Sequence, residues 1–435
     1  MTAFRATILA IGDELLLGEK VDTNSAWLAA QVIALGGRPV AQRTLADDRA
    51  AIACAMAEAE GDVVLVTGGL GPTADDLTRF ALGDVVAPGQ SLLTDDAAAD
   101  RLRAFFERHG RVMPASNLVQ VQHPVGTTLL KNPNGTAPGL FASTDTHLLA
   151  CLPGPPREMK PMFEALVAPA LRERFGSAAP LVTTLVHAFG LGESAAAERL
   201  GDLMTRGRDP EIGTTASAGV VTARVRGTDT AAVARDVEQV AALWAPFVYG
   251  TDGVTLSSVV QQMLRAAGQT LATAESCTGG ALAAALVDEP GSSDVFAGGW
   301  VTYANERKTA DLGVSDEVLA THGAVSEPVA RAMALGAARR AGASTALSTT
   351  GIAGPGGEVP GKPVGTVYVG LARRVAGSTW RTHVRRFRFS GSRTVVRQRT
   401  VDAALQMLRH TLAETEHVTF GWESEERLAW EEHSA

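Results

Sequence analysis

Cysteine is scarce in this sequence, which has only three, Cys54, Cys151 and Cys277, among 435 residues. They are far apart and form no Cys-x-x-Cys pair, which argues against a disulfide framework or a structural zinc site and fits a reducing compartment. The chain also lacks an apolar run approaching about 20 residues. No basic segment followed by an apolar one stands at its amino terminus. We therefore expect a cytoplasmic protein.

An excess of positive charge is missing as well. The 47 acidic residues outnumber the 39 basic ones, and the net charge of −8 gives no general attraction to nucleic acid. The one basic cluster, residues 380–388, is interpreted as the solvent side of a strand. Because 46% of the residues are hydrophobic and 20% charged, the chain is neither disordered nor membrane-embedded in character. We expect no nucleic-acid partner and no membrane partner.

The amino-terminal part alternates apolar, β-branched runs with helical patterns, which predicts an α/β fold. Strands are expected at residues 6–11, 39–43, 62–67 and 146–152, and helices at residues 24–35, 47–60, 94–110 and 156–175. Such alternation is typical of a mostly parallel, doubly wound sheet. Ligands bind at the carboxyl ends of the strands in these sheets, where the GDE motif at 12–14 and the loop after Thr67 fall. The turn-rich residues 132–139 are expected to form an ordered loop.

The length of the chain predicts two or three domains. Residues 181–250 have the pattern of a small α/β unit without a chemical constellation, and a spacer or dimerisation role is expected for them. A third α/β unit has predicted strands at 269–274, 295–303, 346–350, 362–371 and 379–389, and a long closing helix. We place a linker at residues 176–180 and divide the chain into residues 1–176, 177–252, 253–417 and a loosely ordered acidic tail, 418–435.

The stretch TAESCTGG at residues 273–280 is the most distinctive in the third unit. It joins a predicted strand to a helix at 281–287 through two hydroxyls, a thiol and a glycine pair. Glycines allow backbone N–H groups to approach a ligand closely, and a helix start favours negative charge. The stretch therefore predicts an anion or oxyanion site.

Unusual polar residues of this unit follow strands or open helices, so they can converge at one edge of a sheet. They are Glu275, Ser276, Cys277, Thr278, Ser292, Ser293, Tyr303, Lys308, Thr349, Thr350, Lys362 and Arg393. A lysine in a desolvated pocket can lose its proton and act as a general base for a serine, which is acyl-transfer chemistry such as amide hydrolysis. Two alternatives remain. Cys277 could be the nucleophile with Glu275 and Lys308 assisting, or Cys277 could be inert packing, Ser276 a helix cap and Lys308 a solvated side chain.

Taken together, these motifs resemble the CinA (competence/damage-inducible) family over about residues 5–415. Its amidase domain is matched by AESCTGG at 274–280, PGSS at 290–293, YAN at 303–305 with Lys308, GAVS at 323–326, TTGIAGP at 349–355 and KPVG at 362–365. Its amino-terminal domain, which is similar to MoaB/MogA-like molybdopterin-binding domains, is matched by GDELLLG at 12–18, DTNS at 22–25, TGGLGPT at 67–73 with Asp75 and Asp76, and LPG at 152–154.

For the third unit, the resemblance implies a hydrolase that converts nicotinamide mononucleotide (NMN) into nicotinate mononucleotide and ammonia, in pyridine nucleotide salvage and NAD metabolism. No cofactor is implied for this amidase. The implied nucleophile and base are Ser293 and Lys308. Ser276, also implied to be catalytic, and Thr350 would assist the reaction or bind the amide and its oxyanion. The remaining substrate contacts are Tyr303 at the nicotinamide ring, Arg393 at the phosphate, and Thr278, Gly279 and Gly280 in the surrounding loop.

For the first unit, the resemblance implies an ADP-ribose pyrophosphatase that needs a divalent metal ion and is helped by potassium. The amides of Gly68, Gly69 and Gly71, with Thr73, would hold the diphosphate. The implied metal ligands are the carboxylates Glu14, Asp75 and Asp76. The alternative is a nucleotide- or molybdopterin-binding scaffold, linked to competence or the DNA damage response, without catalysis in this domain. The family also implies a homodimer.

Overall fold

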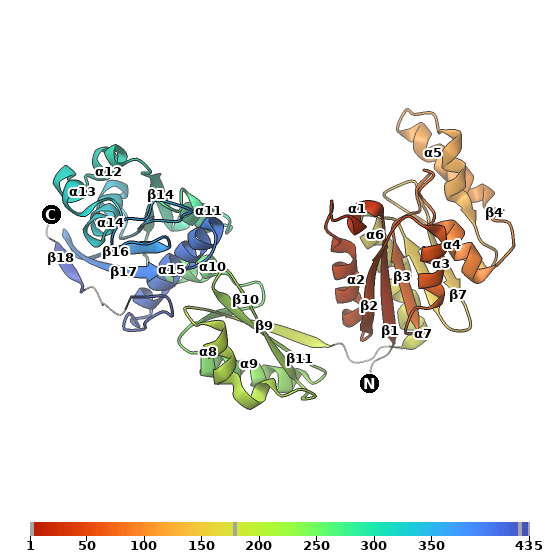
Figure 1. Cartoon of the computed structure of the whole chain (residues 1–435), viewed down its shortest axis with the longest axis horizontal. Coiled ribbons are helices and arrows are strands. Elements are labelled where there is room, and N and C mark those ends of the chain that lie inside the picture. Colours follow the sequence, from red (N-terminus) through yellow and green to blue (C-terminus); the bar gives the residue numbers. More distant parts are fainter. Residues whose placement is uncertain (1–3, 177–180, 425–428, 434–435) are drawn as a thin grey trace. The chain divides into compact units, whose positions relative to one another are not determined.

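The computed structural model describes residues 4–176, 181–424 and 429–433 (Figure 1). The chain divides into two units, Met1–Leu181 and Val182–Ala435, each with its own core. Most of the linker predicted at 176–180 lies outside the described residues. No helix in the described ranges combines the length and the apolar character that crossing a membrane would require.

The first unit is built on a six-stranded sheet in the order β2-β1-β3-β8-β7-β6. Strands β2, β1, β3 and β8 run parallel, β7 is antiparallel to β8, and β6 is antiparallel to β7. The central strands β3 and β8 are buried along their whole length, as their continuous apolar runs require. The bounds are β1 (Arg5–Ile11), β2 (Arg38–Leu45), β3 (Val63–Thr67), β6 (Thr127–Leu130), β7 (Gly139–Ser143) and β8 (Leu148–Leu152), with a small ladder of β4 (Leu93–Thr94) and β5 (Gln122–His123).

Helices cover both faces of this sheet, which confirms the predicted doubly wound α/β fold. One apolar cluster joins α2, α6 and α7 to one face, and another joins α3 and α4 to the other. The bounds are α1 (Asp13–Leu16), α2 (Thr23–Ala34), α3 (Arg49–Ala57), α4 (Thr78–Val86), α5 (Asp96–Arg108), α6 (Pro156–Met162) and α7 (Ala168–Phe175), with a 3₁₀ turn η1 (Ala115–Val121) and a π turn η2 (Phe163–Val167). The loop predicted at 132–139 is ordered: the Asn132 side-chain amide donates to the Ala137 carbonyl at 2.9 Å and to Glu158 Oε2 at 2.7 Å.

The second unit contains two sheets. The smaller one, in the order β10-β11-β9-β12, is antiparallel. Its elements are β9 (Val182–Phe189), α8 (Glu193–Leu200), the 3₁₀ turn η3 (Gly201–Met204), β10 (Glu211–Ser217), β11 (Val220–Gly227), α9 (Thr230–Trp244) and β12 (Val248–Thr251). Residues 181–250 therefore contain the small α/β unit that their pattern predicted.

The larger sheet has the order β14-β13-β15-β16-β17-β18, in which β13 is parallel to β14 and β15 and the others are antiparallel. Helices α12 and α14 pack on one face, and α10, α11 and α15 on the other. The strands are β13 (Leu271–Glu275), β14 (Phe296–Val301), β15 (Thr345–Gly351), β16 (Thr366–Ala376), β17 (Thr379–Arg388) and β18 (Glu431–His433). The helices are α10 (Leu256–Ala266), α11 (Ala281–Val287), α12 (Asn305–Leu312), α13 (Asp316–His322), α14 (Glu327–Ala341) and α15 (Arg393–Leu412), with a 3₁₀ turn η4 (Ser292–Asp294).

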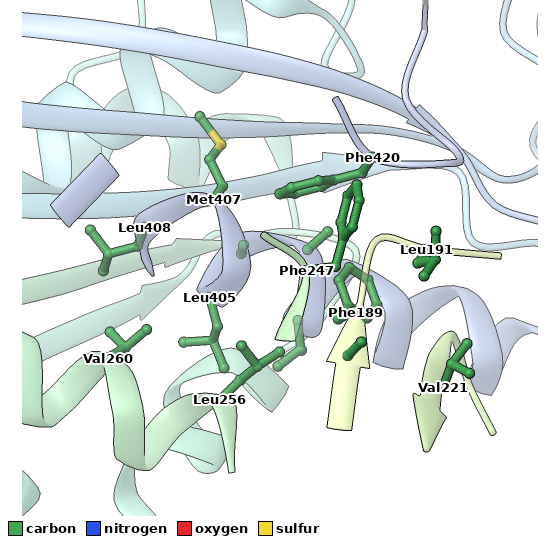
Figure 2. Close-up of a cluster of buried hydrophobic side chains, with 14 of the residues drawn as sticks. Phe189, Leu191, Val221, Phe247, Leu256, Val260, Leu405, Met407, Leu408 and Phe420 are labelled. Atoms are coloured by element: carbon green, nitrogen blue, oxygen red, sulfur yellow. The ribbon is translucent and has the colours of Figure 1, made fainter. Parts of the chain in front are cut away.

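The two sheets of the second unit share one apolar core (Figure 2). Phe189 and Phe247 of the smaller sheet pack in the same cluster as Leu405 of α15 and Phe420. The Gln406 side chain on α15 donates to the carbonyls of Phe189 and Phe247 at 3.0 and 3.1 Å. Residues 182–251 are thus joined to the larger sheet of the second unit by apolar packing and by buried hydrogen bonds. The dimerisation role of these residues stays a prediction.

The carboxyl-terminal segment differs from the loose tail that we expected. Phe420 is only 2% exposed, and β18 pairs with the edge strand β17. Arg385 of β17 is also 2% exposed, donates to the Val418 carbonyl at 2.8 Å and forms an ion pair with Glu423 at 3.2 Å. The basic cluster at 380–388 therefore does not lie wholly on the solvent side, because this segment buries Arg385.

Candidate active site and nucleotide cavity

The carboxyl ends of β13, β14 and β15 bring three hydroxyl residues into one row. Glu275 is in register with Val301 and with Thr349. The ladder continues for one more residue, since the Ser276 amide donates to the Thr349 carbonyl at 2.8 Å and the Thr302 amide to the Glu275 carbonyl at 2.8 Å. Thr302, Ser276 and Thr350 therefore lie side by side where the parallel strands end.

This row faces the helices α12 and α14. Ala272 and Ala274 of β13 pack in the apolar cluster of α14, so Ser276, two residues further, points to the same side. The Thr350 hydroxyl donates to the Ala324 carbonyl, just before α14, at 2.7 Å. The Thr302 hydroxyl is buried, and within the described residues it has no hydrogen-bond partner. We call this surface of the sheet the α14 face.

Lys308 of α12 lies at the same place. Its side chain is 1% exposed, and its Nζ donates to the Thr302 carbonyl at 2.8 Å and to the Tyr303 carbonyl at 3.2 Å. Neighbouring strands are about 4.8 Å apart, so the Thr302 carbonyl that binds this amine belongs to a residue one strand spacing from Ser276. Burial lowers the pKa of Lys308 below its ordinary value. The alternative of a solvated lysine is wrong, and a buried amine beside a serine can act as its base.

Ser293 lies at the opposite end of β14. It is exposed on the turn η4, before the strand begins, whereas Lys308 follows the strand. β14 has six residues, which corresponds to a length of about 20 Å. Within one chain the predicted pair of Ser293 and Lys308 is therefore wrong. Because β13 is parallel to β14, the serine at the lysine's end of the sheet is Ser276.

Glu275 organises the strand-turn-helix corner. Its buried carboxylate accepts the amides of Gly280, Leu282 and Ala283 at 2.9, 3.0 and 2.8 Å, and the Thr278 hydroxyl at 2.7 Å. Hydrogen bonds to a carboxylate are stronger than those between neutral groups. The side chain of the preceding strand thus caps the start of α11, which sequence reasoning missed.

The loop donors are consequently engaged inside the corner. Besides the Gly280 amide on Glu275, the Gly279 amide donates to the Ser276 carbonyl at 3.2 Å, and the Thr278 hydroxyl also meets the Thr349 hydroxyl at 2.6 Å. The expectation that Thr278, Gly279 and Gly280 offer free donors to a substrate therefore has to be corrected. They hold the backbone of Ser276 in position.

Cys277 is 5% exposed, and burial raises the pKa of its thiol to about 12. A thiol is a nucleophile only after it loses its proton. At neutral pH this cysteine is a small packing residue, and the alternative thiol mechanism has no support in the structure.

Tyr303 and Arg393, both predicted substrate contacts, are brought together. Arg393, the first residue of α15, donates to the Tyr303 hydroxyl at 3.1 Å and to the Gly354 carbonyl at 2.9 Å. Tyr303 is 61% exposed. One helical turn further, Arg397 donates to the Thr278 carbonyl at 2.6 Å. The spacing of four residues from Arg393 was the available sign that Arg397 would join the site.

In the first unit, a cavity of about 350 Å³ lies at the carboxyl ends of β1, β3 and β8. Its wall includes the loop after β3, where Gly68 and Gly69 have φ values of 104° and 65°. A side chain at Gly68 would collide with the Ile11 carbonyl, and one at Gly69 with the Thr78 hydroxyl. These glycines therefore let the backbone line the cavity directly. Beneath the loop, the fully buried Arg79, also missed from the sequence, donates to the Leu70 carbonyl at 3.2 Å.

The carboxylates around this cavity do not form the predicted metal site. Asp76 accepts the amides of Gly71 and Thr73 at 2.7 and 2.8 Å and also the Thr73 hydroxyl, so it closes the loop. Asp75 is exposed, and Glu14 faces Lys20 at 3.5 Å. Across residues 4–176 and the other described ranges, no three His, Cys, Asp or Glu side chains are arranged to hold a metal ion. Asp76 and Thr73 therefore act as structural partners of the glycine loop, and the set Glu14, Asp75 and Asp76 does not fit a divalent cation as it stands.

Comparison with known proteins accounts for nearly the whole chain. Three family models match: "Probable molybdopterin binding domain" over residues 7–173, "Damage-inducible protein CinA KH domain" over residues 183–250 and "CinA C-terminal domain" over residues 254–412. A CinA-like protein of Geobacter metallireducens is 42% identical over 416 residues, covering 94% of this chain and 99% of that relative. The chain belongs to the CinA family.

Other CinA relatives agree. A CinA-like protein of Salinibacter ruber is 41% identical over 418 residues, covering 94% of this chain and all of that relative. Among solved structures, a CinA superfamily protein from Klebsiella pneumoniae is 38% identical and covers 37% of this chain and 96% of its own, with a TM-score of 0.35. The competence/damage-inducible protein CihA from Agrobacterium tumefaciens is 42% identical, with coverages of 36% and 93% and a TM-score of 0.34.

Proposed function

We propose that the carboxyl-terminal part of the chain hydrolyses the carboxamide of NMN to nicotinate mononucleotide and ammonia, as a step of pyridine nucleotide salvage. The observation that carries this proposal is the buried Lys308 amine, held on the Thr302 carbonyl beside Ser276. A serine with a neutral amine as its base is a known arrangement for attack on an amide. Membership of the CinA family supports the same class of reaction.

In the first half of the proposed reaction, Lys308 takes the proton of the Ser276 hydroxyl, and Oγ attacks the carboxamide carbon. When the tetrahedral intermediate collapses, the C–N bond breaks and Lys308 returns the proton to the leaving nitrogen, which departs as ammonia. In the second half, a water molecule gives its proton to Lys308 and attacks the ester carbon. The C–Oγ bond of this second tetrahedral intermediate then breaks and Lys308 returns the proton to Oγ, so the products are the nicotinate carboxyl group and a regenerated serine.

Two groups at the same edge of the sheet suit the rest of this substrate. The exposed Tyr303 ring offers a π face to a pyridinium cation such as the nicotinamide ring of a mononucleotide. Arg393 orients the Tyr303 ring through its hydrogen bond to the tyrosine hydroxyl. The Tyr303 ring thus suits a substrate that carries a pyridinium ring.

The test is ammonia release from NMN by the full-length protein. We expect Ser276→Ala and Lys308→Ala each to lower kcat by at least about 10³-fold, since both remove a group that reacts. Ser293→Ala is the matched control, because Ser293 is an exposed serine of the same domain and should leave the rate within about twofold of wild type. An active Ser276→Ala variant, or an inactive Ser293→Ala variant, contradicts the proposed nucleophile.

For the first unit we propose a nucleotide-binding cavity, and ADP-ribose pyrophosphatase activity with a divalent metal ion and potassium as its finer function. The backbone of Gly69 in the wall of the cavity supports phosphate binding. The Gly68 amide, which was also predicted to hold the diphosphate, donates instead to the Leu152 carbonyl at 3.0 Å. Because the carboxylates do not fit a metal ion as they stand, we derive no step through one. ADP-ribose cleavage with and without a chelator is the test, and the chelator should leave ammonia release unchanged. Binding of ADP-ribose without cleavage favours the scaffold alternative.

We also propose that the protein forms a homodimer, as the family resemblance implies. Light scattering of the full-length protein measures its molar mass in solution and tests this proposal.

A further inference from the structure

A second cavity, of about 280 Å³, opens on the α14 face and has no part in the function proposed so far. It lies between the end of α13, the first turn of α14 and the strands β16 and β17. Its polar lining includes Ser326, Lys362 and Arg386. The strand predicted at 362–371 begins only at Thr366, which leaves Lys362 in the preceding loop beside this cavity. We call it the α14 cavity.

The α14 cavity has two cationic side chains that no carboxylate among the described residues pairs with. Lys362 Nζ donates to the His322 carbonyl at 2.9 Å, and Arg386 Nη2 donates to the Gly361 carbonyl at 3.0 Å. Over the described ranges, neither side chain forms an ion pair. The one acidic residue of the lining, Glu327, is paired with the buried Arg331. Two cations held by neutral carbonyls at a cavity favour an anionic ligand.

The first turn of α14 also favours an anionic ligand. Ser326 occupies the N-cap position, but its hydroxyl donates to the Gly323 carbonyl at 2.7 Å and caps no amide of this 15-residue helix. Pro328, the second residue of the helix, has no N–H, so the first-turn amides are those of Glu327 and Val329. The first amides of a helix are natural donors to an anion when no side chain takes them. With a lysine and an arginine beside them, they match the oxygen atoms of a phosphate group.

The cavity also lies in the row that contains Ser276. Thr350 is in register with Tyr368, and Tyr368 with Arg386, so the row runs across the sheet from the serine to the cavity. Tyr368 lines the cavity and lies two strands from Ser276, about 10 Å away. A ligand that extends along the ends of the strands could therefore reach both places.

We propose that the α14 cavity is a phosphate-binding site, formed by Lys362, Arg386 and the first turn of α14. The phosphate can come from the substrate bound at Ser276, in which case the inference rests on the proposed amidase, or from a separate phosphorylated ligand. Arg393, hydrogen-bonded to Tyr303 and Gly354, then orders the ring side of the site rather than holding the phosphate.

Calorimetric titration of the full-length protein with inorganic phosphate tests the site without any turnover. Lys362→Gln and Arg386→Gln should each weaken phosphate binding about tenfold, since each removes a charged hydrogen-bond donor. Arg381→Gln, which removes a charge from the exposed part of the same strand β17, is the matched control and should bind as wild type does. Unchanged phosphate binding in both cavity variants, or loss of binding only in Arg393→Gln, overturns the proposal.

Kinetics then identify the source of the phosphate. If it belongs to the substrate, Lys362→Gln and Arg386→Gln lower kcat/KM about tenfold for NMN and leave kcat/KM for nicotinamide riboside unchanged. If the phosphate binds as a separate ligand, the variants lose phosphate binding but keep the wild-type preference between the two substrates. A wild-type protein that releases no ammonia refutes the amidase and leaves the phosphate titration as an independent measurement.

Discussion

Replacing Glu275 by glutamine tests the corner on which the proposed site depends. The two Glu275 oxygens accept four hydrogen bonds, three from backbone amides at the start of α11 and one from Thr278. Oε2 takes three of them, and Oε1 takes the Ala283 amide. A glutamine can present only one carbonyl oxygen, so its amide group has to face at least one buried N–H donor.

The expected cost follows from these bonds. Leaving one buried donor unsatisfied costs about 1–3 kcal/mol, and the bonds that remain lose their ionic character. Relief from burying a carboxylate offsets part of this loss. We therefore expect Glu275→Gln to destabilise the second unit by about 2 kcal/mol. For a unit of this size, that corresponds to a decrease in Tm of roughly 4–8 °C.

Scanning calorimetry of the full-length protein measures this decrease, and ammonia release measures the effect on the site. We expect kcat to fall together with Tm, because the turn that Glu275 holds carries Ser276. Glu317→Gln, the same chemical change at an exposed position of α13, is the matched control and should leave both quantities unchanged. If Glu275→Gln has the Tm and the kcat of the control, the carboxylate does not hold the corner.

Three further outcomes follow from the second unit. Lys308→Arg should abolish ammonia release at every pH, because arginine keeps the charge but gives up no proton. The wild-type rate should rise with pH as Lys308 loses its proton, with a midpoint below the ordinary lysine pKa of 10.5. Cys277→Ala should keep most of the activity, since burial raises the pKa of the thiol to about 12; an inactive variant would restore the thiol mechanism. Asp402→Asn should remove a pH dependence of Tm. Burial raises the pKa of Asp402 to about 7, so its contribution to stability is present at acidic pH and is lost as pH rises to about 7. The change amounts to at most about 4 kcal/mol, and equal Tm profiles of variant and wild type between pH 5 and 8 would contradict it.

Local patterns were sufficient for most elements of the fold. The run predicted at residues 62–67 is apolar from Val63 to Val66, and it forms the central strand β3 (Val63–Thr67), buried on both faces. The helix expected from residue 47 begins at Arg49, where Asp48 accepts the Ala51 amide at 2.8 Å, as a capping aspartate does. The tail was misjudged because its charge suggested solvation. Phe420 and the pairing of β18 with β17 depend on partners far away in the sequence.

At the candidate sites, the sequence did not predict which residues lie close together. The family resemblance paired Ser293 with Lys308, but the two residues flank one strand, which separates them by its full length. In the first unit, Asp76 has the right chemistry for a metal ligand, yet the folded loop uses its carboxylate for the amides of Gly71 and Thr73. Neither the separation of Ser293 from Lys308 nor the role of Asp76 could be predicted without the path of the backbone in three dimensions.

The sequence by itself determined the α/β class, the order of the elements and the residues that carry chemistry, because these depend on local periodicity, turn residues and side-chain type. Only the tertiary structure decided which of these residues meet. Ser276, rather than Ser293, lies beside Lys308 because β13 and β14 are parallel and end together. The physical reason is that side chains on different strands become neighbours only when strand direction, register and face have all been set.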